Sequence, residues 1–362
     1  MRKNTFLWML LALFVAVSSY AQEKKYAMYG IGFYNLENLF DTCHDEGHND
    51  YEYLPDGQNK WTGLKYSHKL RNMARVLSEM GTDKLPNIGC AAIGVSEVEN
   101  AKCLTDLCDQ EPLKARNFQF VHVEGPDQRG VDCALLYNPR LFKVRDVKLV
   151  PYIYVKPEDS LRATRGFLTV SGTLAGEHVA VIVNHLPSRF AGSYYREEGG
   201  RQIRIVKDSL LQDDPNVKIF IMGDMNDDPQ DPSMATALGA RRHIKDVEEG
   251  GLWNPWWDVL ASGTGTLQYD GKWNLFDQII LSRSLLDMDN MKDIKKNKRP
   301  ELKNINCTGL TYWDHQVFRR DYLFQKDGRY KGNTLRTHAG GAWLDGFSDH
   351  LPTVVYVIKE QQ

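Results

Sequence analysis

Apolar residues in this chain gather in short runs that are rich in β-branched side chains and are bounded by polar residues or glycine. Runs of this length and composition predict β-strands. We expect nine strands, which cover Tyr29–Tyr34, Ile88–Val95, Phe118–Val123, Val131–Tyr137, Gly166–Leu174, Val179–Val183, Lys218–Met222, Gln278–Leu281 and Thr353–Ile358.

Only a few segments show the helical period. Tyr66–Met80 places Leu70 and Leu77 on one face, Arg201–Leu211 repeats this spacing, and Ala101–Asp109 is expected to form a third helix. Many strands with few helices between them predict an α+β or layered α/β/α domain, built on two mostly antiparallel sheets.

A chain of 362 residues can form one large layered domain or two ordinary ones. Its hydrophobic residues, 42% of the total, are enough to fill the core of such a domain. No Ser/Gly/Pro linker, charge block or repeat divides it. We therefore expect a single domain over residues 22–362. The segment around 284–336 is polar and rich in Lys and Asn, so we expect it to be an insertion before the last strand.

The N-terminal residues have the composition of a targeting segment. Arg2 and Lys3 precede the apolar stretch Phe6–Val17, and small residues follow at Ser19 and Ala21. This order predicts a signal peptide over residues 1–21. A membrane anchor is the alternative, but the stretch is shorter than the roughly 20 residues that span a bilayer. We expect an exported protein, periplasmic or extracellular, with no transmembrane anchor in the mature chain.

Charge and cysteine content narrow the classes of partner. Lys and Arg number 45 against 47 Asp and Glu, so no net basic field predicts a polyanion partner, and any nucleic-acid binding must be local. Export would place the cysteines in an oxidising compartment, where disulfides persist. Their pairing cannot be read from the sequence; Cys90 and Cys133 fall in apolar runs and are expected to be buried thiols. The six cysteines are Cys43, Cys90, Cys103, Cys108, Cys133 and Cys307.

Polar residues with catalytic potential stand at the ends of the predicted strands. In a layered sheet such strand ends converge on one rim, where carboxylates, amides and imidazoles form a site for a hard cation such as Mg²⁺. The chemistry that this set suits is metal-assisted hydrolysis of a phosphoester. The residues are Asn35, Glu97, His185, Asp224, Asn226, Asp277, Asp349 and His350.

Each of these residues has a plainer interpretation when it is taken alone. A Gly-Asp-x-Asn sequence such as Gly223–Asn226 is more often a turn, and an isolated His185 is more often structural. The polar stretch Cys43–Asp50 is expected to be a surface loop and not a metal cluster. Four tryptophans could form a stacking platform or a lipid-facing wedge, although core packing is favoured: Trp253, Trp256, Trp257 and Trp273.

Several short motifs that occur in this order resemble those of the endonuclease/exonuclease/phosphatase family, in its secreted bacterial, deoxyribonuclease- and sphingomyelinase-like form. The chain lacks the P-loop, G-x-S-x-G and H-E-x-x-H motifs. The matching segments are Tyr34–Asn38, Ser96–Asn100, Arg129–Asp132, Asn184–Ser188, Gly223–Asn226, Phe276-Asp277 and Ser348–His350.

The resemblance implies a four-layered αββα sandwich with the site at one rim, and it implies roles for individual residues. Glu97, Asn35 and Asp349 would surround the metal. His350 would activate water and Asp277 would hold it. The remaining roles concern the phosphate: Asp224 and Asn226 would position the nucleophile or leaving group, and His185 and Asn226 would bind the phosphoryl oxygens. Arg165 could add a phosphate contact, because guanidinium donors match phosphate oxygens.

The expected activity is that of a secreted, divalent-metal-dependent phosphodiesterase or nuclease that uses Mg²⁺, with Mn²⁺ and Ca²⁺ as alternatives. A phosphatase or phospholipase C-like enzyme acting on sugar, inositol or lipid phosphates is the second hypothesis, and a mildly acidic chain without a basic stripe favours it over duplex DNA. A non-catalytic binding protein on the same fold is the third. The chain is expected to be a monomer with no stable protein partner.

Overall fold

Two β-sheets form the centre of the molecule. The computed structural model describes residues 25–291 and 307–361, so the predicted signal peptide lies outside the described residues. The first sheet has six strands in the order β14 (Thr311–Val317), β17 (Thr353–Glu360), β1 (Tyr26–Leu39), β2 (Cys90–Val98), β4 (Asp132–Tyr137) and β3 (Gln119–His122). The second has seven, in the order β5 (Phe142–Val150), β6 (Phe167–Leu174), β7 (Glu177–His185), β8 (Lys218–Asp224), β13 (Asp277–Ser282), β10 (Leu252–Trp253) and β9 (Ala240–Arg241).

Both sheets are mixed, and most of their strand pairs are antiparallel. In the first sheet only β1 and β2 run parallel to each other. In the second sheet the β7–β8 and β9–β10 pairs are parallel. This arrangement confirms the predicted α+β class with two mostly antiparallel sheets.

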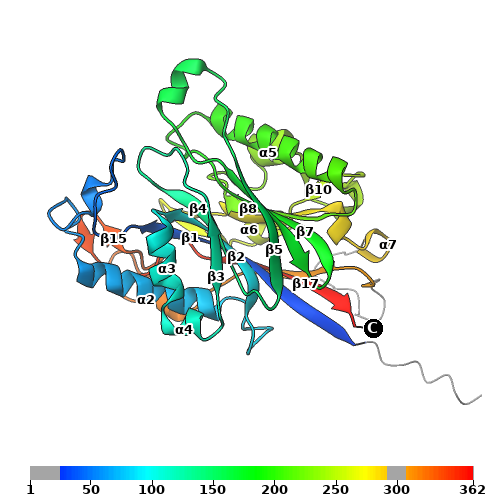
Figure 1. Ribbon diagram of the computed structural model, residues 1–362, viewed down its shortest axis with the longest axis horizontal. Helices are drawn as coiled ribbons and strands as arrows, with labels where there is room; N and C mark the ends of the chain where they lie inside the picture. Colours follow the sequence, from blue (N-terminus) through cyan, green and yellow to red (C-terminus); the bar gives the residue numbers. More distant parts are fainter. Residues whose placement is uncertain (1–24, 292–306, 362) are drawn as a thin grey trace, which may run out of the picture.

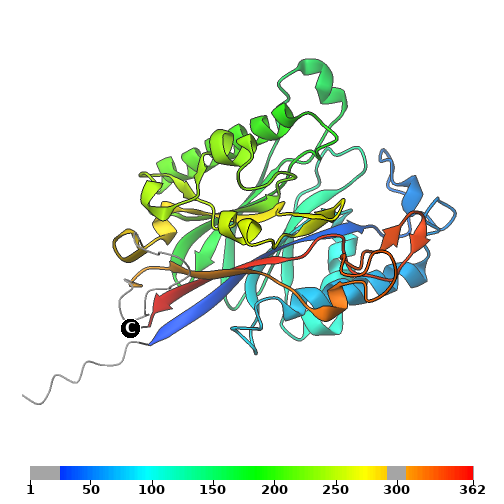
Figure 2. The same ribbon diagram turned by 180° about the vertical axis from the view of Figure 1, so that it is seen from behind.

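Helices cover the outer face of each sheet (Figures 1 and 2). Helix α2 (Gly63–Glu79) lies against the first sheet, beside the shorter α3 (Ala101–Cys108) and α4 (Glu111–Lys114). Helix α5 (Ser193–Asp213) covers the second sheet, where its buried Ile203 belongs to the same apolar cluster as the sheet residues. The result is a four-layered αββα sandwich, as expected.

The two sheets approach each other closely at Gly94 of β2. A Cβ atom on Gly94 of β2 would lie only 2.5 Å from the Sδ atom of Met222 on β8 and 3.1 Å from a methyl carbon of Val183 on β7. Such a contact is shorter than van der Waals packing allows. Glycine at this position therefore sets the spacing between the sheets and, with it, the relative positions of the strand ends.

The predicted helices begin and end close to the observed ones, with one large difference. Helix α2 matches its prediction and ends before Gly81, whose φ of 78° is the left-handed conformation common after a helix. Helix α5 begins at Ser193, eight residues before its predicted start at Arg201. Its first turns contain Glu197, Glu198, Gly199 and Gly200, whose composition weakens the helical signal.

Two long strands were not predicted, β5 and β14. Each lies at an edge of its sheet, so one side of the backbone has no strand neighbour. In β5 the charged residues Lys143, Arg145 and Lys148 interrupt the apolar pattern, as is common on edge strands. Strand β14 lies inside the segment predicted as a polar insertion, of which residues 292–306 lie outside the described part.

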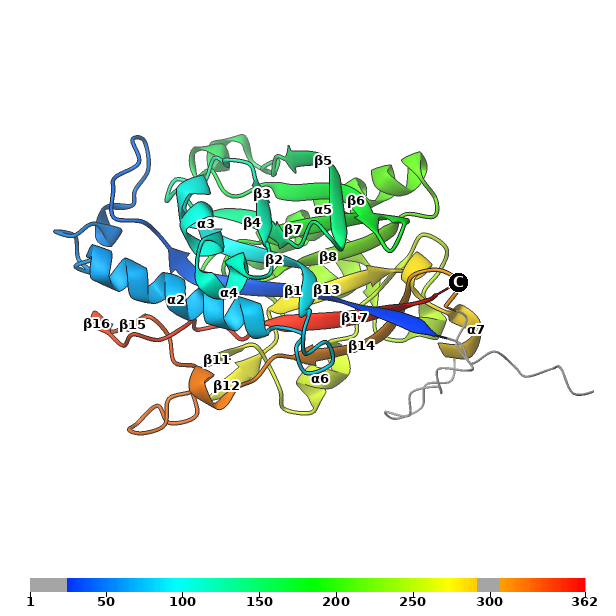
Figure 3. The ribbon, with the colours of Figure 1, turned by 60° about the horizontal axis from the view of Figure 1, so that its bottom comes forward.

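Short elements and hairpins complete the fold. Helices α6 (Trp257–Ala261) and α7 (Met288–Met291) are one or two turns long. Two small hairpins, β11 (Leu267–Tyr269) with β12 (Lys272–Asn274) and β15 (His338–Ala339) with β16 (Ala342–Trp343), extend from the sandwich (Figure 3). These four strands and the equally short β9 and β10, each of two or three residues, were not predicted either.

The cysteines and tryptophans lie mostly in the core. None of the six cysteines, all of which lie in the described residues, forms a disulfide, and Cys90 and Cys133 are buried, as predicted. Trp253 and Trp256 are also buried, and the indole nitrogen of Trp256 donates to the backbone oxygen of Ile279 at 3.0 Å. Core packing therefore accounts for these two tryptophans. Among the described residues, no helix is both long and apolar enough to cross a membrane.

Candidate active site

Strand register brings the predicted catalytic residues together at one rim of the sandwich. Strands β7 and β8 pair in parallel with His185 opposite Asp224, and β8 pairs with β13 so that Asp224 also lies opposite Asp277. On the neighbouring sheet, Asn35 of β1 pairs with Ser96, the residue before Glu97. Residues that are far apart in the sequence thus converge through two sheets, as the strand-end pattern predicted.

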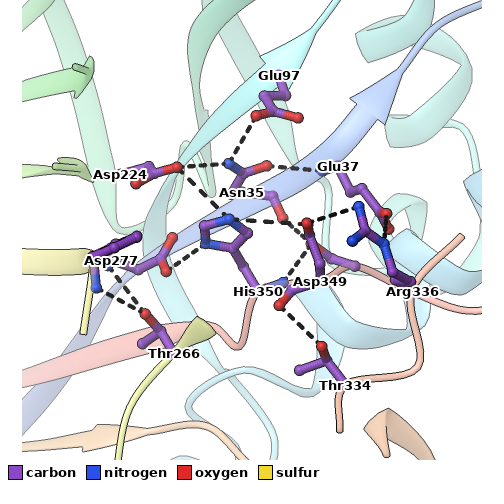
Figure 4. A network of polar contacts seen from close by, with 12 residues as sticks. Asn35, Glu37, Glu97, Asp224, Thr266, Asp277, Thr334, Arg336, Asp349 and His350 are labelled. Carbon is purple, nitrogen blue, oxygen red and sulfur yellow. Dashed lines mark hydrogen bonds and ion pairs between the residues drawn. The ribbon is translucent and has the colours of Figure 1, made fainter. Parts of the chain in front are cut away.

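Two hydrogen bonds fix the position of His350. Its Nδ1 lies 2.7 Å from Oδ2 of Asp277, and its backbone N–H donates to Oγ of Ser348 at 3.1 Å. The Ser348 hydroxyl donates in turn to the backbone oxygen of Asn35 at 2.8 Å. Because Nδ1 is held by a carboxylate, Nε2 remains as the nitrogen that faces the centre of the site (Figure 4).

Asp277 is itself positioned by a residue that the sequence did not indicate. The hydroxyl oxygen of Thr266 accepts hydrogen bonds from the backbone N–H groups of Phe276 and Asp277, each at 3.2 Å. Residue 266 also lies beside the loop that carries the histidine, because the backbone N–H of Leu351 donates to its carbonyl oxygen at 2.7 Å. Thr266 therefore connects the strand that bears Asp277 to the loop that bears His350.

Glu97, His185 and Asp224 form a group whose ligand atoms all lie within 4.8 Å of one another. Nε2 of His185 lies 3.5 Å from Oδ2 of Asp224 and 3.8 Å from Oε1 of Glu97. The Asn35 amide nitrogen donates to both carboxylates, at 3.2 Å to Glu97 and 3.1 Å to Asp224. Two carboxylates this close repel each other unless a cation or a proton lies between them, so the donor set fits a divalent metal.

Asn35 and Asp349 are the other two predicted metal ligands. Asn35 turns its amide nitrogen toward Glu97 and Asp224, and its oxygen accepts from the backbone N–H of Glu37 at 2.9 Å. Asp349 lies at the edge of the group, with Oδ1 3.9 Å from Nε2 of His350. Direct metal ligation by Asn35 and Asp349 therefore stays a prediction.

Strained backbone supports the metal group. Glu97 and Asn38 adopt positive φ angles of 60° and 57°, and the Asn38 N–H donates to Oε2 of Glu97 at 3.0 Å. Asn226 has a φ of 50° and donates from its backbone to Oδ1 of Asp224 at 2.9 Å. Asparagine tolerates this region, whereas glutamate is strained in it, and such strain is typical of functional sites.

Burial and neighbouring charges shift the pKa values of three site residues. Burial lowers the pKa of His185 well below its usual value, and Arg165 adds to this effect, so its imidazole is neutral. Burial raises the pKa of Asp224 to about 7. Burial also opposes charge on His350, but the carboxylates of Asp277 and Asp224 outweigh it and raise the pKa of this histidine well above its usual value.

Arg336 and Glu37 extend the network beyond the predicted residues. Nε of Arg336 lies 2.8 Å from Oε1 of Glu37, and its Nη2 lies 2.9 Å from Oδ2 of Asp349 (Figure 4). The buried Lys69 donates to Oγ1 of Thr337 and to the backbone oxygen of Phe347, both at 2.6 Å. Of Arg336, Glu37 and Lys69, only Glu37 could have been found from the sequence, because it lies two residues after the predicted ligand Asn35.

Arg165 is buried behind His185. Its Nη1 lies 2.8 Å from Oδ2 of Asp127, and its Nη2 donates to the backbone oxygen of Leu186 at 3.3 Å, whereas the buried Nε has no partner. The side-chain amide of Asn226 donates to the same oxygen of Leu186 at 3.0 Å. Both side chains therefore brace the loop that follows His185, and the phosphate contact predicted for Arg165 remains untested.

Comparison with known proteins agrees with this geometry. The sequence pattern of the Endonuclease/Exonuclease/phosphatase family matches residues 30–359, which is most of the chain and includes every residue of the site. The chain belongs to this family. Family membership makes it a metal-dependent phosphoester hydrolase, in agreement with the donor set at the rim. No curated protein matches the chain.

Solved structures of the family share the fold. A family member from Bacteroides thetaiotaomicron has a TM-score of 0.55 and 14% identity, over 93% of this chain and 100% of that one. A mannosyl-6-phosphatase from the same organism has a TM-score of 0.53 and 15% identity, over 91% and 99%. D. rerio TDP2 in complex with a single-strand DNA product has a TM-score of 0.50 and 13% identity, over 91% and 99%. At this identity the likeness concerns the fold alone.

Proposed function

We propose that the protein is an exported phosphodiesterase that hydrolyses nucleic acid, with Mg²⁺ as its metal and Mn²⁺ or Ca²⁺ as alternatives. The observation that carries the proposal is the charge state of the arginines around the site. Among the described residues there, Arg129 and Arg165 pair with Asp127 at 3.4 and 2.8 Å, and Arg336 pairs with Glu37 and Asp349.

Charge balance connects this observation to the substrate. A phosphodiester carries one negative charge at neutral pH, whereas a phosphomonoester carries up to two. Arginines already neutralised by carboxylates offer little additional positive charge to a dianion. A divalent metal held by Glu97 and Asp224 would likewise be neutralised by these two carboxylates, so the site would offer little excess positive charge for a dianion, which favours the monoanionic diester as substrate.

The residues have distinct roles in the proposed reaction. His350, which is neutral only above its raised pKa, then accepts a proton from the attacking water at Nε2, while Asp277 holds Nδ1 and so sets the tautomer of the ring. The neutral His185 and the Asn226 amide donate hydrogen bonds to the phosphoryl oxygens. A divalent cation, when bound, supplies positive charge to those oxygens and lowers the pKa of water.

One experiment separates the proposed activity from its alternatives. Purified protein is assayed with a phosphodiester and a phosphomonoester of the same p-nitrophenol leaving group, then with a single-stranded oligonucleotide and with sphingomyelin, each with Mg²⁺ and with EDTA. We expect Mg²⁺-dependent cleavage of the diester and the oligonucleotide. Asp224→Asn and His350→Ala should abolish it, and His178→Ala, which removes a histidine from a half-exposed pair with Asp214, should not.

A phosphatase acting on sugar phosphates is the second candidate. The fold likeness to the mannosyl-6-phosphatase favours it, as does the side chain of Arg336, which is 42% exposed and could contact a terminal phosphate. Preference for the monoester in the same assay, together with loss of that preference in Arg336→Ala, would replace the diester proposal with this one.

Export is supported by the sequence of residues 1–21 and is tested separately. Expression in a bacterial host should yield a mature chain that begins at Gln22 in the periplasm or the medium. N-terminal sequencing of the recovered protein checks the cleavage site. A chain that retains Met1 in the cytoplasm would contradict export but would leave the proposed chemistry intact.

A further inference from the structure

A second group of metal-ligating side chains lies away from the catalytic residues. His122 at the end of β3, Glu124 in the following loop and Asp132 at the start of β4 place one ligand atom each within 4.8 Å of one another. The side chains of His122 and Asp132 are only 5% and 4% exposed, and Nε2 of His122 lies 2.9 Å from Oδ2 of Asp132. Glu124 is exposed and borders solvent.

A second histidine lies beside the β3–β4 connection, on a segment distant in the sequence. His48 lies in the polar loop Cys43–Asp50. This loop is attached to the β3–β4 connection by a hydrogen bond from the backbone N–H of Asn49 to the backbone oxygen of Gln128 at 2.7 Å. Nδ1 of His48 is buried without a hydrogen-bond partner. His48 is not one of the three residues whose ligand atoms lie within 4.8 Å of one another, so its ring would have to shift to bind the same ion.

The backbone leaves room for the group through two glycines. A Cβ on Gly125 would lie 2.4 Å from Oδ1 of Asp132, and a Cβ on Gly130, which has a φ of 73°, would lie 3.1 Å from Nδ1 of His48. Any larger residue at either position would displace a candidate ligand. The two glycines thus leave room for the side chains of Asp132 and His48.

We propose that His48, His122, Glu124 and Asp132 form a structural zinc site. Two imidazoles and two carboxylates match the nitrogen and oxygen ligands of tetrahedral Zn²⁺, whereas Mg²⁺ prefers oxygen alone. Tetrahedral ligands at about 2.0–2.1 Å from zinc lie about 3.3 Å apart. The observed separation of 2.9 Å between His122 and Asp132 needs only a small increase to reach this spacing.

The carboxylates of Glu124 and Asp132 each place an oxygen in the same group of ligand atoms, so a cation between them would offset their mutual repulsion. A plain His122–Asp132 hydrogen bond is the alternative, but it leaves the Nδ1 of His48 unsatisfied.

The location gives the site a role in the architecture of the active site. Asp132 pairs with Val98, the neighbour of Glu97, in the β2–β4 ladder. The loop between Glu124 and Asp132 also carries Asp127, which holds Arg165 at 2.8 Å. Zinc would therefore fix the His48 loop and the Asp127 loop to each other beside Glu97, without contacting substrate.

Zinc titration of purified, chelator-treated protein tests the proposal. All samples carry Asp224→Asn and contain saturating Mg²⁺, so that the catalytic group does not take up zinc. Calorimetry should show one equivalent of Zn²⁺, and bound Co²⁺ should give the visible absorption of a tetrahedral nitrogen–oxygen site. Glu124→Gln should weaken binding at least tenfold, and His122→Asn should abolish it.

A matched control separates a built site from any histidine–aspartate pair. His178 lies 2.7 Å from Asp214 and belongs to no such group among the described residues, so His178→Asn should bind zinc like the parent. Glu124 is exposed, so its substitution keeps the test valid even where His122→Asn fails to fold. Equal zinc binding by the parent and Glu124→Gln, or no binding by the parent, overturns the proposal. Unchanged binding in His48→Asn would remove that histidine from the ligand set and contradict the four-ligand site.

Discussion

Asp277 and His350 lie 73 positions apart in the sequence, yet Oδ2 of the aspartate lies 2.7 Å from Nδ1 of the histidine, and both side chains are buried. The aspartate comes from the first residue of β13 and the histidine from the loop before β17, which belong to different sheets. The pair therefore joins the two halves of the sandwich at the point where chemistry takes place.

Replacing Asp277 should change the pH dependence of the reaction. The charge of Asp277 raises the pKa of His350, so Asp277→Asn should lower it. Because the proposed base must be neutral, the acid limb of the pH–rate profile should move to lower pH, while the maximal rate falls because the ring is less well held. Steady-state rates from pH 5 to 9 measure both effects. A limb that stays in place or moves to higher pH would show that His350 is not the base.

Removing the Glu97 carboxylate should mainly weaken Mg²⁺ binding and have little effect on the fold. Glu97→Gln deletes one of two carboxylates near His185, so we expect the Mg²⁺ concentration for half-maximal activity to rise at least about tenfold. Excess Mg²⁺ should restore part of the activity. Glu158→Gln, at an exposed position, is the matched control and should leave the Mg²⁺ response unchanged. An unaltered response in Glu97→Gln would remove this residue from the metal site.

Gly223 should be intolerant of any side chain. A Cβ at this position would lie 2.1 Å from the backbone oxygen of Asn184, so Gly223→Ala must shift β7 against β8 next to His185 and Asp224. We expect a loss of about 1–3 kcal/mol in the free energy of unfolding and a loss of activity. The control is Gly63→Ala at the start of α2, where nothing lies within 4 Å; it should be neutral or stabilise by about 0.4–1 kcal/mol. Chemical denaturation of both variants checks the contrast.

Lys69 of helix α2 should contribute to the free energy of unfolding. Its buried ammonium group donates to Thr337 and to the backbone oxygen of Phe347, which lies three residues before His350. Lys69→Met removes both hydrogen bonds and leaves the Phe347 oxygen with only the 3.3 Å hydrogen bond from the Thr337 hydroxyl, so we expect a loss of about 1–3 kcal/mol in the free energy of unfolding. Arg71→Ala, on the exposed face of α2, should change it by less than about 0.5 kcal/mol. Similar values for the two variants in urea denaturation would contradict this role.

Much of the fold could be predicted because the central strands are apolar on both faces. Strand β17 is buried from Thr353 to Ile358, which are the bounds predicted from its apolar run. The edge strands β5 and β14 could not be predicted, since the exposed side of an edge strand accepts the charged residues that break the pattern. Their positions depend on which strand lies beside them, and the local sequence does not contain that information.

The candidate site also contains residues that could be predicted from the sequence and residues that could not. Strand-end position and motif order were enough to predict that residues such as Glu97 and Asp224 belong to one site, and the structure brings them within ligand distance. Thr266 and Arg336 had no such signal. The first acts through hydrogen bonds to backbone groups of β13, and the second reaches Glu37 across 299 positions of sequence.

By itself the sequence determined the residue types, the strands that carry them and therefore the class of chemistry, because metal ligands and a paired histidine stand directly at the ends of apolar runs. Only the tertiary structure decided their partners. It assigned Arg336 to Asp349, turned the Asn35 amide nitrogen toward the carboxylates, and brought His48 beside the β3–β4 loop. Contacts of this kind depend on sheet register and loop packing, which are set by burial over the whole domain and not by neighbours in the chain.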